Sequence, residues 1–132
     1  MPPASPLWQS SYATNYTRSI AMARRVLTSR WDEMSLERIT EMVSRKVIAG
    51  ARQRLAQVWL KRGALVARHA HDGEQITYVL DGALRYSVDG EDVMVRAGDV
   101  LVIPPGAKHQ ITVLEDALVI NALSGPSRPS EL

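Results

Sequence analysis

Apolar and polar residues alternate along most of the chain after residue 41, which is typical of strands that bury one face. Gly, Pro and Asp residues separate the alternating runs, and Asp81-Gly82 and Asp89-Gly90 are each typical of a tight hairpin. Short strands at this even spacing favour an all-β sandwich or barrel. The strands are predicted at residues 42–48, 54–60, 64–71, 76–80, 83–88, 93–95, 100–103, 111–114 and 117–123.

The residues on either side of this β region differ from it in composition. Residues 1–30 contain three prolines and no acidic residue, which predicts a flexible or partner-bound N-terminal arm. Met22 precedes Ala-Arg-Arg and is an alternative start; a transit peptide shares this composition, but no amphipathic helix supports one. We therefore divide the chain into an arm at 1–30, a β-barrel at 31–124 and a Pro/Ser-rich tail at 125–132. Within the barrel, residues 31–41 are ambiguous; Ser35–Arg38 is able to open a helical turn, but the segment is short.

Composition predicts one globular domain, because 132 residues with 45% hydrophobic residues suffice for a single core. Cysteine is absent, which excludes disulfides, thiolate metal sites and cysteine nucleophiles and fits a reducing, cytoplasmic compartment. No apolar run reaches the length of a membrane span, and the first residues lack the features of a secretory signal.

Charge is unevenly distributed, although the net charge is only +2. Residues 1–68 contain 12 Lys/Arg and 4 Asp/Glu, whereas residues 69–132 contain 4 and 10. A basic half can mark a nucleic-acid surface, but here the basic residues are scattered among apolar ones without a helix-turn-helix pattern. We therefore expect no nucleic-acid partner, and interpret the asymmetry as oppositely charged surfaces that pack within the barrel or across a dimer.

The three histidines of the chain form one pattern, His69-Ala70-His71 followed by His109. Residues i and i+2 of a strand point to the same face, so His69 and His71 project together. Imidazole is the commonest transition-metal ligand, and Gln75 adds an oxygen donor. These donors suit Fe, Mn, Ni, Co or Zn and leave coordination positions open, as in catalytic rather than structural metal sites.

Glu74 is the alternative fourth ligand, and strand parity argues against it. Gln75 is four residues after His71, so in an extended segment it faces the same side and Glu74 points outward. An amide oxygen carries no charge, so the bound ion keeps its full +2. Such an ion is a strong Lewis acid and attracts an anionic substrate.

Two motifs carry a family resemblance. Gly63-x5-His69-x-His71-x3-Gln75-x6-Gly82 resembles the first cupin motif, and Gly98-x5-Pro104-x-Gly106-x2-His109 resembles the second. The resemblance covers residues 40–123 and implies a double-stranded β-helix, or jelly-roll barrel, that is often a homodimer. It also implies one divalent metal inside the barrel, bound by His69, His71, Gln75 and His109. Two departures stand out: Gln75 replaces the usual Glu, and Val113 replaces a common Asn.

The sequence from His69 to Gly82 is similar to that of small pectin-degradation cupins, which linearise 4,5-unsaturated uronates and also use a Gln ligand. Those cupins end with an aspartate, a phenylalanine and an arginine, where this chain has Asn121, Leu123 and, one residue late, Arg128. An aspartate can move a proton, whereas Asn121 can only hydrogen-bond. The resemblance therefore implies the fold and the metal site, but not the reaction.

Beyond the ligands, a possible substrate pocket comprises Trp59, Thr77, Val79, Asn121 and Leu123. Thr77 and Val79 share the parity of Gln75, whereas a residue such as Trp59 is more often a core or dimer contact than a platform for a substrate. Three functions remain open: a metal-dependent lyase or isomerase acting on a small anionic acid, an Fe or Mn dioxygenase, and a non-catalytic binding or sensing module. We favour the first, and its catalytic base is unassigned.

Overall fold

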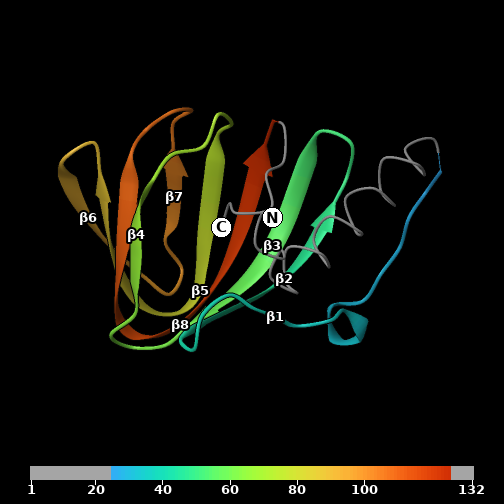
Figure 1. The fold of residues 1–132 in the computed structure, drawn as a ribbon, viewed down its shortest axis with the longest axis horizontal. Helices are drawn as coiled ribbons and strands as arrows, with labels where there is room; N and C mark the ends of the chain where they lie inside the picture. Colours follow the sequence, from blue (N-terminus) through green and yellow to red (C-terminus); the bar gives the residue numbers. More distant parts are fainter. Residues whose placement is uncertain (1–24, 126–132) are drawn as a thin grey trace, which may run out of the picture.

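The computed structural model describes residues 25–125, and these residues form a β-barrel of eight strands (Figure 1). The predicted arm at 1–30 lies outside the described residues up to residue 24, as does the tail from residue 126 onward. In the described part of the chain, no helix has the length and apolar character needed to span a membrane. The elements in chain order are η1 (Trp31–Glu33), β1 (Glu37–Arg38), β2 (Val43–Ala49), β3 (Gln53–Leu60), β4 (Leu65–His69), β5 (Gln75–Val88), β6 (Glu91–Arg96), β7 (Val100–Ile103) and β8 (His109–Ser124).

Antiparallel pairing in the order β1-β2-β3-β8-β5-β6 builds the barrel, with β4 added to β8 and β7 added to β5. The long strands β5 and β8 each contribute to two walls of the barrel. The first half of β5 pairs with β7 and the end of β8, and its second half pairs with β6 and the start of β8. The predicted pairs of short strands in these regions are therefore each one continuous strand that bends.

Gly82 is the point at which β5 bends, and the predicted hairpin at Asp81-Gly82 is wrong. The register between β5 and β8 shifts between Val79 and Leu84, yet the strand continues. A β carbon at Gly82 would lie 2.7 Å from the Cα of Ala117, so the close approach of β8 leaves room only for glycine. By contrast, the hairpin at Asp89-Gly90 is confirmed, because both residues have positive φ and Val88 pairs with Glu91.

The ambiguous segment at 31–41 contains the short turn η1, but Glu37–Arg38 forms strand β1 rather than part of a helical turn. Glu37 pairs in register with Arg45 of β2, and Arg45 Nε donates to Glu37 Oε2 at 3.3 Å. Both side chains are buried. Burial raises the pKa of the Glu37 carboxyl, and the neighbouring Arg45 charge opposes this shift. The buried ion pair holds β1 against the barrel, an interaction that local sequence patterns do not reveal.

The inward-facing side chains fall into two layers. At one end of the barrel, which we call the base, they are mainly apolar and include Val58, Val79, Leu84 and Val119, although the buried Arg45 lies in the same cross-strand row as Val58. At the other end they include several polar side chains, among them Gln75 and Thr77. We call this end the mouth; β4 stops there and β5 begins there. The same strands supply both layers, since Gln75 and Thr77 precede Val79 on the inner face of β5.

Candidate metal centre

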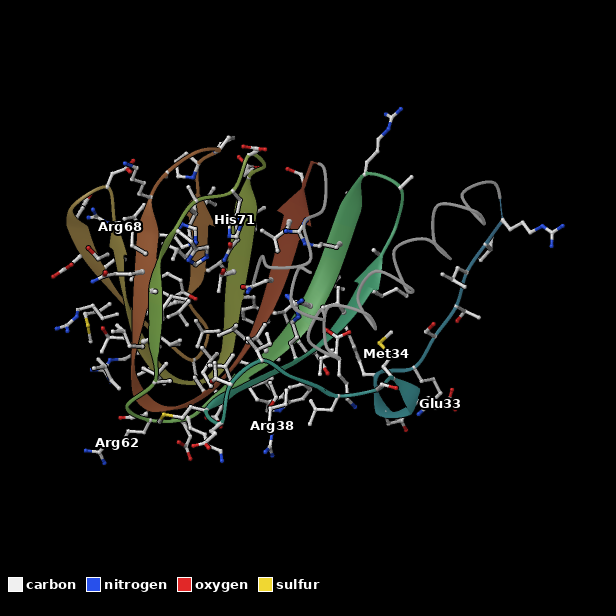
Figure 2. The ribbon with its side chains drawn as sticks, viewed as in Figure 1. Glu33, Met34, Arg38, Arg62, Arg68 and His71 are labelled. Carbon is white, nitrogen blue, oxygen red and sulfur yellow. The ribbon has the colours of Figure 1, made fainter. Side chains whose placement is uncertain are left out.

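The mouth brings the three histidines together. His69 ends β4 and pairs in register with His109, the first residue of β8, while His71 follows β4 by two residues. The ring centroid of His69 lies 4.8 Å from that of His71 and 4.2 Å from that of His109, and the centroids of His71 and His109 are 5.0 Å apart. One nitrogen atom from each of the three rings lies within 4.8 Å of the other two. Figure 2 shows His71 on the inner side of the barrel near the end of β4.

Backbone carbonyls orient two of the rings in the same way. His69 Nδ1 lies 2.9 Å from the Ala67 carbonyl oxygen, and His109 Nδ1 lies 3.0 Å from that of Ala107. A carbonyl only accepts hydrogen bonds, so Nδ1 carries the proton and Nε2 carries the lone pair. Both Nε2 atoms are buried without a hydrogen-bond partner. Orphaned acceptors of this kind, fixed by the bond on the opposite nitrogen, match a metal-ligating histidine.

Gln75 supplies a further orphaned acceptor. Its Nε2 donates to Thr77 Oγ1 at 2.9 Å, and Thr77 Oγ1 donates to Asn121 Oδ1 at 2.7 Å. These bonds hold the amide nitrogen, while Gln75 Oε1 is buried without a partner. Because a buried amide oxygen is costly to leave unsatisfied, this arrangement fits a Gln75 Oε1 that would bind a metal ion.

Desolvation shapes the protonation states around the centre. Burial lowers the pKa of the His109 imidazole; the nearby His69 also lowers it, while the Ala107 carbonyl and Asp89 oppose the shift. The neutral ring is the form that binds metal. Below the centre, burial raises the pKa of the Tyr86 hydroxyl well above its usual range, and a hydrogen bond with Thr77 partly opposes this. Tyr86 therefore stays protonated and extends the polar network of Gln75, Thr77 and Asn121.

The loop between His71 and Gln75 turns at residues 72–73, so the extended segment assumed in the parity argument does not occur. Gln75 is nevertheless buried and Glu74 exposed, because the turn carries the chain into β5 beside the end of β8. Gly73 allows this turn, since a β carbon there would collide with the Ser124 carbonyl oxygen. Ser124 N donates to the Glu74 carbonyl oxygen at 3.0 Å and fixes the loop.

The predicted pocket residues occupy different places. Thr77, Val79, Asn121 and Leu123 face the interior, with Val79 in the base. Trp59 lies on the outer face of β3, where Lys46 Nζ is 5.8 Å from its ring centroid, so it stands apart from the histidines. Figure 2 shows Arg62 and Arg68 pointing away from the barrel, and both are exposed.

Sequence reasoning missed Arg54 and Tyr86, two buried polar side chains on the inner face. Parity offered the signal for both. Arg54 shares the inner face of β3 with Ala56, Val58 and Leu60, and Tyr86 shares the face of Leu84 on β5. A charged residue at an inward position of a strand is therefore as informative about a candidate site as a histidine.

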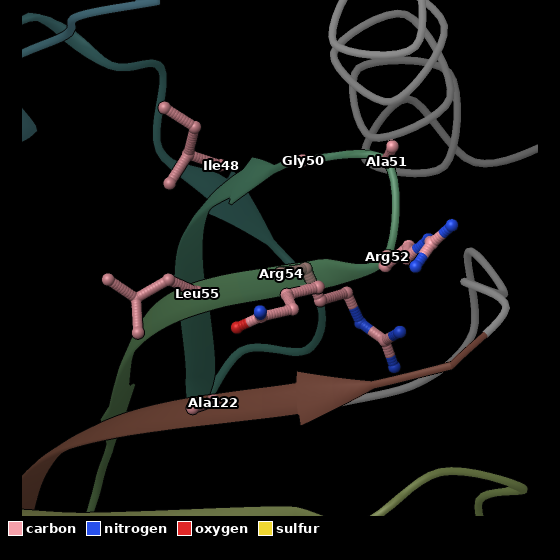
Figure 3. Close-up of a pocket in the computed structure, with 8 residues that line it drawn as sticks. Ile48, Gly50, Ala51, Arg52, Arg54, Leu55 and Ala122 are labelled. Carbon is pink, nitrogen blue, oxygen red and sulfur yellow. The ribbon is translucent and has the colours of Figure 1, made fainter. Parts of the chain in front are cut away.

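A separate pocket of about 500 Å³ lies at the hairpin between β2 and β3 (Figure 3). It is lined by Ile48, Gly50, Ala51, Arg52, Gln53, Arg54, Leu55 and Ala122, and includes none of the histidines or Gln75. Its lining offers no cluster of metal donors, so the candidate metal site lies at the histidines rather than in this hollow.

Comparison with known proteins agrees with this geometry. The family model Cupin_2, described as a cupin domain, matches residues 57–122. The chain is 32% identical over 74 residues to the uncharacterized protein MJ1618 of Methanocaldococcus jannaschii, covering 55% of this chain and 59% of that protein. It is 27% identical over 99 residues to the pectin degradation protein KdgF of Dickeya dadantii, covering 74% of this chain and 90% of that protein. The solved structure of KdgF from Halomonas sp. superposes with a TM-score of 0.72 at 28% identity, covering 78% of this chain and 96% of that one.

Proposed function

This chain belongs to the Cupin_2 family of cupin domains, and from that premise we propose that it is a metal-dependent lyase or isomerase acting on a small, anionic, sugar-acid-like substrate. His69, His71, His109 and Gln75 would hold one divalent transition ion. The observation that carries the proposal is the set of buried, unpartnered acceptors at the mouth: Nε2 of His69, Nε2 of His109 and Oε1 of Gln75.

The donor set fits Fe, Mn, Ni, Co or Zn, since imidazole nitrogens and one amide oxygen suit each of these ions. Four protein donors leave positions open for substrate in a five- or six-coordinate site. When bound, the ion would polarise a substrate carbonyl or hydroxyl oxygen as a Lewis acid. All four donors are neutral, so nothing in the ligand set cancels the ionic charge, and an anionic substrate is favoured.

No buried carboxylate among the described residues is placed to transfer a proton at the mouth. The one buried acid of the described residues is Glu37, and it is paired with Arg45. Arg45 lies in the cross-strand row of Val79, and Val79 is four residues along β5 from Gln75, roughly 13 Å away. Asn121 holds Thr77 in place but cannot take up a proton. Isomerisation needs only to move protons within the substrate or through water, so it suits this mouth.

The similarity to KdgF, a pectin degradation protein, supports a sugar-acid substrate. The direct test is to add a 4,5-unsaturated uronate to metal-loaded protein and follow loss of the ultraviolet absorbance of its double bond. Faster loss than in buffer with free metal supports the proposal. Oxygen consumption with an enolisable acid would instead indicate a dioxygenase, and binding of an acid without turnover would indicate a sensing module.

We also propose that two copies pair through the outer face of the wall formed by β3, β8, β5 and β7. Two cross-strand rows on this face are largely apolar, Leu55-Ala122-Ile76-Val102 and Gln57-Ile120-Tyr78-Val100. Tyr78, Val100 and Val102 are 44%, 62% and 55% exposed. An exposed apolar face of this kind favours association of two sheets. Light scattering should give twice the chain mass, and Tyr78→Lys should give the single mass; a monomeric wild type contradicts the pairing.

A further inference from the structure

Arg54 places a positive charge on the inner face of the barrel beside the candidate metal ligands. Arg54 is only 3% exposed. In the pairing of the strands, Arg54 of β3 lies opposite Leu123 of β8, and Leu123 lies opposite Gln75 of β5. The three residues therefore form one cross-strand row at the mouth. With neighbouring strands about 4.8 Å apart, the Cα atoms of Arg54 and Gln75 are roughly 10 Å apart.

The side chain of Arg54 occupies a buried position of β3, in step with the inward-facing Ala56 and Val58. Figure 3 shows it running from β3 toward β8, whereas Arg52 extends from the hairpin turn away from β8. The residue between Arg54 and Gln75 is Leu123, which has no polar atom in its side chain to compete for the guanidinium. A guanidinium has five N–H donors, so it can serve a partner within the protein and still present two parallel donors to a ligand.

We propose that Arg54 binds the carboxylate of the substrate while a second oxygen of the same molecule faces the histidines and Gln75. A planar guanidinium matches a carboxylate in bidentate geometry, and the low-exposure setting strengthens the pair. The spacing suits a small acid that bears a hydroxyl or carbonyl oxygen a few bonds from its carboxylate. This inference deepens the proposed function and rests on it for the second oxygen, but the carboxylate contact itself requires only Arg54.

The test compares each of two acids with a neutral counterpart: galacturonate with galactose, and pyruvate with hydroxyacetone. Binding to the full chain is measured by calorimetry, on zinc-loaded and on metal-free protein. We expect wild type to prefer each acid that binds by at least tenfold over its neutral counterpart. Arg54→Gln should remove that preference while leaving the zinc stoichiometry unchanged. Arg52→Gln, the same change two residues away on an exposed side chain, should keep it.

Two further variants guard against a folding defect. Arg54→Met replaces the guanidinium with an apolar side chain suited to a buried position and should also lose the preference. Arg54→Lys keeps the charge without the bidentate fork and should retain only part of it. Circular dichroism must match wild type for each variant that is compared.

The outcomes separate this inference from the function on which it rests. If wild type binds no metal, or turns over no acid, but prefers acids in an Arg54-dependent way, the carboxylate site stands and the proposed function falls. If Arg54→Gln and Arg54→Met keep the preference, or if wild type binds neither acid more tightly than its counterpart, the assignment of Arg54 is overturned whatever the metal content.

Discussion

The mouth and the base of the barrel are built from the same strands yet differ in the chemistry of their inward-facing residues, most clearly along β5. Along the inner face of β5, Gln75 and Thr77 lie in the mouth, and Val79 and Leu84 lie in the base. Backbone alternation is the same in both, so the fold does not require the polar residues. Burying polar acceptors without partners costs stability, and proteins accept that cost mainly at functional sites. The base therefore supplies mainly apolar packing, whereas the mouth holds the candidate metal site.

Removal of a mouth histidine is expected to have the largest effect. His109→Ala should reduce bound metal from about one ion per chain to less than about a tenth, because two remaining imidazoles and one amide hold an ion weakly. Elemental analysis gives the metal content, and circular dichroism should remain that of a folded barrel. Gln110→Ala, at the next position of β8, is the matched control and should keep the metal. Full metal content in His109→Ala would refute the role of this ligand.

The converse change is made in the base. Leu84 is fully buried, and Leu84→Ala should lower the free energy of unfolding by about 2–5 kcal/mol through lost contacts and a cavity. Leu84→Met keeps the volume and should cost less than about 1.5 kcal/mol. Denaturant titration measures both. Metal bound per folded chain should be unchanged in each variant, and a selective loss of metal in Leu84→Ala would show that mouth and base are not separable.

A smaller effect is expected one contact away from the centre. Asn121 accepts a hydrogen bond from Thr77, which in turn accepts one from the Gln75 amide. Asn121→Ala should weaken metal affinity by about 10-fold, the lower end for partners that orient a ligand. Competition with a chelator measures the affinity. Asn121→Asp keeps the acceptor and should bind metal at least as well as wild type; equal affinity in Asn121→Ala would exclude the positioning role.

The smallest effect concerns acid stability of the metal-free protein. Because burial lowers the pKa of His109 below the ordinary value of 6.5, the unfolded chain binds a proton below pH 6.5 that the folded chain does not. The free energy of unfolding should therefore fall as pH decreases from 6.5 to the folded-state pKa, by at most about 1.4 kcal/mol per pH unit for this group. Denaturant titrations of His109→Asn should show a shallower fall over that interval. An unchanged pH dependence would contradict this contribution.

Sequence patterns predicted most of this architecture, because alternation reports which face of a strand is buried. The strands near 43–49, 53–60 and 100–103 were predicted within one or two residues, as was the turn at Asp89-Gly90. The continuity of β5 through Gly82 was not, since an Asp-Gly pair looks the same in a hairpin and in a bend that another strand approaches. The pairing of Glu37 with Arg45 was also missed, because it links residues through tertiary structure.

For the site, the histidines were found from their spacing, whereas their surroundings required coordinates. The carbonyls of Ala67 and Ala107 that orient the rings are backbone atoms, which no residue pattern distinguishes. Parity alone placed Thr77 inside the barrel, but not its bond to Asn121, which lies 44 residues away. Arg54 was readable from its inward parity, yet it became meaningful only when β8 brought it into the row of Gln75.

The most direct test of a metal centre at the mouth is the metal content of tag-free wild-type protein, measured by elemental mass spectrometry. The geometry of the three histidines and Gln75 predicts close to one equivalent of a first-row transition metal per chain, either as purified or after reconstitution. Less than about a tenth of an equivalent under both conditions would contradict a metal centre at the mouth and leave the mouth as a binding surface without metal chemistry.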